Sequence, residues 1–145
     1  MRYSDTIKLQ NPIAEARRYV DNARDTLQKN GQLDEETGLY EDSKYVKAAG
    51  HYLWSAMLLA MEAVFHVRGA KIKKKGDDAR VDIDDYKEVI AQRDRKLLGW
   101  VVAAYNIAHL YMSYDGIQDK DVCMKGIHLT ETVIDRCASM MGGEN

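Results

Sequence analysis

The spacing of apolar residues constrains this chain more than any other feature, because it repeats at three and four positions along most of the sequence. Such a repeat places the apolar side chains on one face of an α-helix, which turns once in about 3.6 residues. The alternation of apolar and polar residues that marks a half-buried strand is missing. We therefore expect an all-α protein. The clearest stripe is formed by Ile13, Ala16, Val20, Ala23 and Leu27.

Start and stop signals divide the periodic segments into four helices. Asn11 is a favourable N-cap, Pro12 suits the first helical turn, and Gly31 is a natural end. In the third segment the apolar steps continue past Gly99, so one long helix fits better than two, although glycine costs about 1 kcal/mol relative to alanine there. We expect a single domain, residues 1–145, that folds as an antiparallel up-and-down four-helix bundle. The predicted helices cover residues 12–30, 43–68, 84–115 and 119–141.

Composition narrows the class of protein. The chain has 145 residues, 46% of them hydrophobic, which is enough for a sizeable core and excludes a disordered chain. Its 21 basic and 23 acidic residues give a net charge of −2, which argues against a general nucleic-acid binder. The richest apolar stretch, residues 54–67, is shorter than a membrane span and is interrupted by polar residues. The N-terminus has no apolar signal segment, so we expect a cytoplasmic protein without membrane contact.

Two charged segments connect the predicted helices. Residues 32–42 hold five acidic residues and no basic one, which predicts a solvated loop. Residues 70–81 form a basic loop, in which Lys73, Lys74 and Lys75 are the candidates for a phosphate or nucleic-acid contact. The simpler interpretation of that loop is a solvated connection, because it has no aromatic residue that could stack on a base.

Metal and redox chemistry is not expected. Glu62 and His66 share a helix face, as do His128 and Glu131, but neither pair has the Glu-x-x-His order of a di-iron bundle. Ion pairs at the surface are the preferred interpretation, with no metal and no cofactor. The two cysteines, Cys123 and Cys137, lie about 21 Å apart along one helix and cannot form a disulfide with each other. We interpret both as small buried hydrophobic residues.

The end of the third predicted helix carries the candidate ligand site. Tyr105 and His109 are four positions apart, and Asn106 and Tyr114 are near them. Each of these side chains combines an apolar part with a group that can form hydrogen bonds, so that together they could bind a polar ligand. The alternative is a polar layer that seals one end of the core, with the tips bonded to one another.

Three stretches of the chain together resemble the HEPN-type helical bundles of bacteria. The resemblance implies a bundle of four or five helices that is often a dimer, and a partnership with a minimal nucleotidyltransferase in toxin–antitoxin modules. It also implies metal-independent ribonuclease activity in some members. The stretches are residues 14–24 (AEARRYVDNAR), 45–56 (YVKAAGHYLWSA) and 105–109 (YNIAH).

The ribonuclease signature of that family, an arginine and a histidine separated by four to six residues, is not intact. Arg95 is the nearest arginine before His109 and stands fourteen positions earlier. No catalytic residue is therefore assigned, and we expect a homodimeric binding or interaction module, partnered by a nucleotidyltransferase or binding a nucleotide. Nine tyrosines and two tryptophans agree with a dimer interface. The alternatives are a ribonuclease with His109 as general base and a purely structural dimeric bundle.

Overall fold

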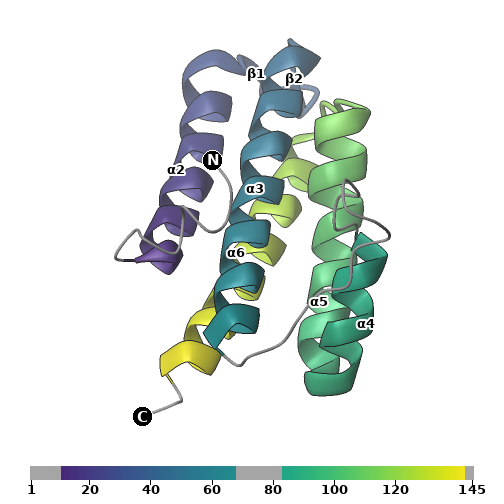
Figure 1. Ribbon diagram of the computed structural model, residues 1–145. Helices are drawn as coiled ribbons and strands as arrows, with labels where there is room; N and C mark the ends of the chain where they lie inside the picture. Colours follow the sequence, from purple (N-terminus) through teal and green to yellow (C-terminus); the bar gives the residue numbers. More distant parts are fainter. Residues whose placement is uncertain (1–10, 68–82, 143–145) are drawn as a thin grey trace, which may run out of the picture.

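The computed structural model describes residues 11–67 and 83–142, which form helices and one small hairpin (Figure 1). The expectation of an all-α protein is confirmed for this part of the chain. The predicted phosphate contacts Lys73, Lys74 and Lys75 lie outside it. In chain order the elements are α2 (Pro12–Asn30), β1 (Leu33–Asp34), β2 (Leu39–Tyr40), α3 (Ser43–Val67), α4 (Ile83–Arg93), α5 (Arg95–Ala104), the π-helix η1 (Tyr105–Tyr114) and α6 (Lys120–Gly142).

The long helices run in opposite directions as the chain proceeds. In Figure 1, α2 rises, α3 descends, α5 and η1 rise together, and α6 descends behind α3, while the shorter α4 lies beside α5. Helix α3 is central, because it packs against α2, α6 and η1. Its inward face is wide, and Leu53, Met57 and Met61 are fully buried in the core. None of the described helices combines the length and apolar character that crossing a membrane requires.

The third predicted helix is not continuous, because Asp94 interrupts it. The backbone of Asp94 is extended, and its carboxylate accepts the Leu97 N–H at 3.0 Å, which caps α5. Arg136 on α6 donates to the same carboxylate through Nε at 2.6 Å, and the Asp94 side chain is only 8% exposed. Burial acts to raise the pKa of Asp94, but the Leu97 N–H and the Arg136 guanidinium together hold it below 3.8. The break is therefore fixed by a contact with a distant helix.

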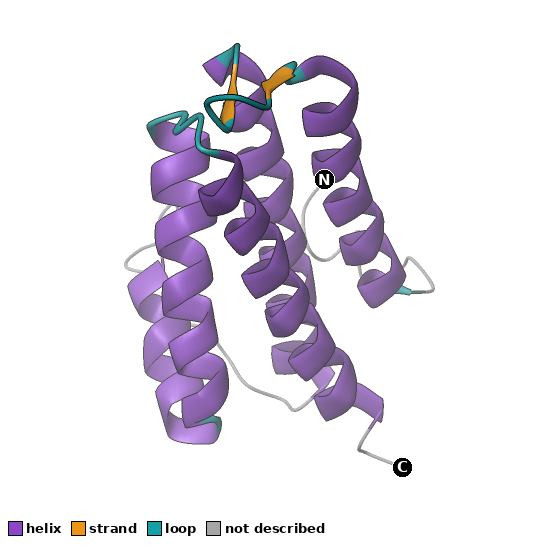
Figure 2. Ribbon diagram, turned by 180° about the vertical axis from the view of Figure 1, so that it is seen from behind, coloured by secondary structure: helices purple, strands orange, loops and turns teal. Residues whose placement is uncertain are grey.

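The acidic segment 32–42 is mostly exposed, as expected, but it is not an irregular loop, because it folds into a two-stranded antiparallel hairpin (Figure 2). Asp34 opens the turn, and its carbonyl accepts the Gly38 N–H at 2.8 Å. Gly38 has a φ of 73°, in the left-handed region that favours glycine. Tyr40 is buried and donates its N–H to the Gln118 carbonyl at 2.8 Å. The hairpin thus joins the start of α3 to the segment that leads into α6.

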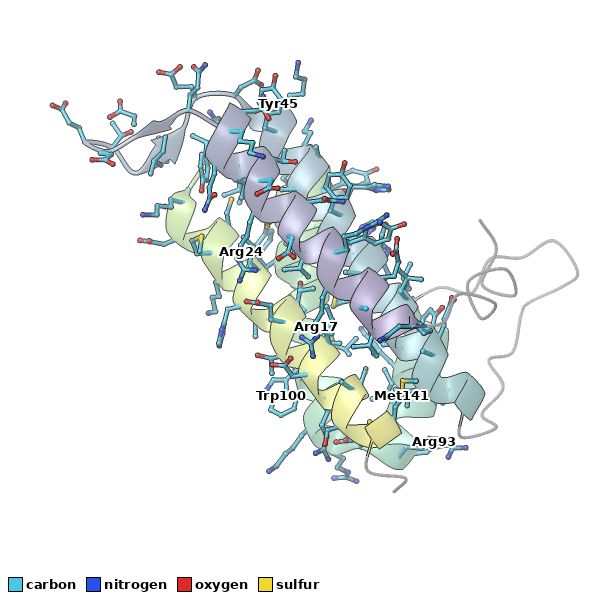
Figure 3. All side chains as sticks on the ribbon, turned by 90° about the vertical axis from the view of Figure 1, so that its left-hand side faces the viewer. Arg17, Arg24, Tyr45, Arg93, Trp100 and Met141 are labelled. Carbon is cyan, nitrogen blue, oxygen red and sulfur yellow. The ribbon has the colours of Figure 1, made fainter. Side chains whose placement is uncertain are left out.

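Two arginines of α2 connect that helix to α6 (Figure 3). Arg24 Nη2 lies 2.6 Å from Glu131 Oε1, and Arg17 Nη1 lies 2.8 Å from Asp135 Oδ1. Because these side chains are partly exposed, each pair is worth at most about 1 kcal/mol. They fix which face of α2 meets α6, while the stability of the contact comes from buried residues such as Ala23.

Gly50 allows η1 to lie unusually close to α3. A Cβ atom at this position would stand 2.5 Å from the Ala108 carbonyl oxygen and would also overlap the Ser113 backbone nitrogen. Gly126 on α6 admits Met112 in the same way, since its Cβ would lie 2.8 Å from the Met112 sulfur. Helix η1 therefore meets a glycine on each of two neighbouring helices.

The two glycines Gly50 and Gly99 should respond in opposite ways to replacement by alanine. Gly50→Ala should lower the free energy of unfolding by about 1–3 kcal/mol, because the new methyl group meets backbone atoms that cannot yield. Gly99→Ala should raise it by about 0.5–1 kcal/mol, since Gly99 lies inside α5 with open space around it. Urea unfolding of both variants measures the difference, and equal effects would contradict the close approach.

Candidate functional site

The four residues of the candidate ligand site all lie on η1, a π-helix of 10 residues. Its wider turn shows in the bond from the Asp115 N–H to the Leu110 carbonyl, which spans five residues and measures 2.9 Å. Most π-helical segments are single-turn bulges, and they occur frequently at functional sites. Residues 105–114, which were expected to be α-helical, therefore form a rarer π-helix at the predicted site.

Trp54 of α3 packs with Tyr105 and His109 of η1 to form what we call the ring cluster. The ring centroids lie 5.2 Å apart for Trp54 and Tyr105, 5.3 Å for Trp54 and His109, and 5.0 Å for Tyr105 and His109. The tryptophan and tyrosine rings meet edge to face, at 70°. All three residues are half-buried. The cluster is thus a packed aromatic surface, without a gap between its rings.

The two ring nitrogens of His109 are in different environments. Nδ1 is the one buried side-chain nitrogen or oxygen of the described residues that lacks a hydrogen-bond partner. Nε2 has no partner among the described residues either, but it is not buried. Since an unpartnered N–H is rarer inside proteins than an unpartnered acceptor, we expect the neutral ring to keep its proton on Nε2. His109 then presents an N–H donor to the surface.

The environment of His109 favours the neutral imidazole. Burial lowers the pKa of His109 below its ordinary value of 6.5, and the charge of His51 on α3 lowers this pKa further. His51 is exposed and lies one helical turn before Trp54. The described residues contain no carboxylate that offsets these two effects on His109.

The structure brings together only part of the predicted cluster. Tyr105 and His109 are in contact, whereas Asn106 is exposed and Tyr114 is 74% exposed, with no ring contact or hydrogen bond to another described residue. The predicted polar layer in which the tips bond to one another is not present among these four residues. The ring cluster adds Trp54, which the sequence pattern did not indicate as a site residue. The signal for it is weak, because Trp54 is one of several large apolar residues on α3.

Of the two carboxylate–histidine pairs, only Glu131 and His128 both lie in the part of the chain whose side chains the structure describes, and these two residues do not bind each other. Glu131 binds Arg24, and His128 is exposed. Glu62 accepts a hydrogen bond from the Tyr86 hydroxyl at 2.5 Å, and the His66 side chain lies outside the described residues. Within residues 11–67 and 83–142, no group of three or more potential metal ligands gathers.

The two cysteines are buried and unpaired, as small core residues are. Burial raises the pKa of Cys123 to about 12, with a further contribution from Asp119. Burial likewise raises the pKa of Cys137 to about 12, with Asp94 as the second cause. Because the thiolate is the reactive form, neither cysteine is a nucleophile near neutral pH.

Comparison with known proteins identifies relatives of the whole helical region. The family described as domain of unknown function DUF5618 matches residues 11–139, which include both halves of the ring cluster. One similar solved structure is a protein of unknown function from Dyadobacter fermentans, with 41% identity and a TM-score of 0.77. The similarity covers 88% of this chain and 94% of that one. No curated protein matches the chain.

The burial of His109 predicts a pH dependence of stability. Because its pKa is lower in the folded state, the unfolded chain takes up the proton first as the pH falls. The free energy of unfolding should therefore decrease as the pH falls from 6.5 toward the lowered pKa of His109. His109→Gln should flatten this slope and the exposed His128→Gln should not, as measured by urea unfolding between about pH 5 and 8. Equal slopes in the two variants would contradict the burial of His109.

Proposed function

This chain belongs to the DUF5618 family, and we propose that it is a binding module that holds a planar ligand with hydrogen-bond acceptors on the ring cluster. The observation that best supports the proposal is that the hydrogen-bonding groups of the ring cluster have no partners among the described residues. Trp54 Nε1, the Tyr105 hydroxyl and His109 Nε2 are accessible, and none has a hydrogen-bond partner among the described residues. A surface of aromatic rings with unused donors suits such a ligand.

The strength of such a site can be bounded. Stacking of one planar group on an aromatic side chain is worth about 1–3 kcal/mol, and each neutral hydrogen bond adds about 0.5–1.5 kcal/mol. A fragment that makes one stack and two hydrogen bonds would then gain about 2–6 kcal/mol, which corresponds to a Kd of roughly 0.04–30 mM. A full ligand would need further contacts beyond the ring cluster.

The proposal includes a HEPN-like bundle that forms a homodimer in the cytoplasm, with a nucleotidyltransferase as a protein partner. It draws on the resemblance of residues 14–24, 45–56 and 105–109, which lie on α2, α3 and η1. The antiparallel order of these helices agrees with a bundle of this type.

RNA cleavage is not part of the proposal. Arg93 ends α4 and Arg95 begins α5, at the end of the molecule opposite Tyr45 (Figure 3). At about 1.5 Å per residue, the ten residues of α5 alone separate Arg95 from η1 by about 15 Å. Arg93 and Arg95 of the same chain are therefore too far from His109 to share a phosphate group with it.

Binding of adenosine and uridine, measured by saturation-transfer NMR on the full chain, tests the proposal. Both nucleosides are planar, carry acceptors and have no charge. Tyr105→Leu should weaken binding at least about fivefold, because it removes a stacking face. Tyr114→Leu is the matched control on the same helix and should leave binding unchanged, since Tyr114 lies outside the ring cluster.

Two results would contradict this function. One is the absence of nucleoside binding to the unmodified chain. The other is a Tyr105→Leu variant that unfolds at lower temperature but binds as the unmodified chain does, which would leave the ring cluster with a purely structural role.

A further inference from the structure

A row of three side chains on α3 follows the line along which this helix meets η1. Lys47, His51 and Trp54 are four and three positions apart, so they lie on the same side of α3. The Lys47 Cε lies 2.9 Å from the position that a Cβ at Gly116 would take, beyond the end of η1. Trp54 belongs to the ring cluster, and His51 acts electrostatically on His109. We call this line of contact the α3–η1 seam.

The basic groups of the seam have no acidic partner. Neither Lys47 nor His51 takes part in an ion pair or a hydrogen bond among the described residues. By contrast, Arg17, Arg24 and Arg136 each bind a carboxylate. Two basic side chains four positions apart repel each other when both are charged, which destabilises a helix. An anion placed between them would remove that repulsion.

Among the described residues, the other elements around η1 supply no charged group that shifts the pKa of His109. Helix α6 meets η1 at Gly126, where Ile107 and Met112 approach. Asp115 follows η1 in the chain, is exposed, and has no ion pair among the described residues. Neither Asp115 nor any other described carboxylate contributes to the titration of His109.

We propose that the α3–η1 seam binds an anionic oxygen group, a phosphate or a carboxylate, through Lys47, His51 and the Nε2–H of His109. A lysine ammonium binds such a group as a point charge, and the imidazoles add directed N–H donors. Hydrogen bonds to a charged acceptor are shorter and stronger than neutral ones. The inference rests on the proposed function in one respect, since the anion would be the charged part of the ligand whose planar part contacts the ring cluster.

Binding of the anion should appear in the titration of His109. An anion near the ring favours the imidazolium, so the pKa of His109 should rise by about one unit relative to chloride at the same ionic strength. The titration is followed through the imidazole Cε1–H signals of the full chain in phosphate, acetate and chloride. A rise in phosphate alone identifies a phosphate site, and a rise in acetate as well extends it to carboxylates.

Variants separate a specific site from general screening. Lys47→Gln and His51→Asn should each reduce the rise at least by half, whereas Lys125→Gln, an exposed lysine of α6, should preserve it. The inference is overturned if phosphate and acetate act on His109 as chloride does, or if the rise is unchanged in both seam variants. Nucleosides carry no phosphate, so their binding to the ring cluster would remain valid after such a failure. If the chain instead fails to bind nucleosides while phosphate still raises the pKa of His109, only the proposed function is contradicted.

Discussion

The close approach of η1 to α3 at Gly50 is the contact on which the rest of the candidate site depends. A side chain at that position would meet the backbone of η1 and displace the helix from α3. Because Trp54 stands one turn after Gly50, the same contact sets the distance between its ring and those of Tyr105 and His109. Gly126 completes the arrangement from α6, so the π-helix is positioned by two helices at once.

This packing explains the unusual state of His109. Its Nδ1 is buried without a partner, which costs about 1–3 kcal/mol in a typical protein interior. Contacts between aromatic rings are worth about 0.5–1.5 kcal/mol each, and His109 makes two, to Trp54 and Tyr105. The ring contacts therefore offset much of the cost of the buried nitrogen. The result is an imidazole whose neutral form is favoured and whose second nitrogen is not buried.

The sequence predicted the helical class and the contact between Tyr105 and His109, because both follow from local spacing. It did not predict the break at Asp94, since the apolar steps continue through that residue and its partner Arg136 is 42 positions away. The close approach of η1 depends on glycines of two other helices, and Trp54 reaches the site from α3. These features depend on contacts between distant segments, which periodicity does not encode.

The tautomer of His109 tests the central claim most directly, because it reports which nitrogen is buried. A long-range proton–nitrogen correlation spectrum of the full chain, labelled with ¹⁵N and recorded near neutral pH, distinguishes the two ring nitrogens. We expect the His109 proton on Nε2 and a nitrogen frequency typical of an unprotonated acceptor for Nδ1. A proton on Nδ1, or averaged signals like those of a free imidazole, would contradict the account.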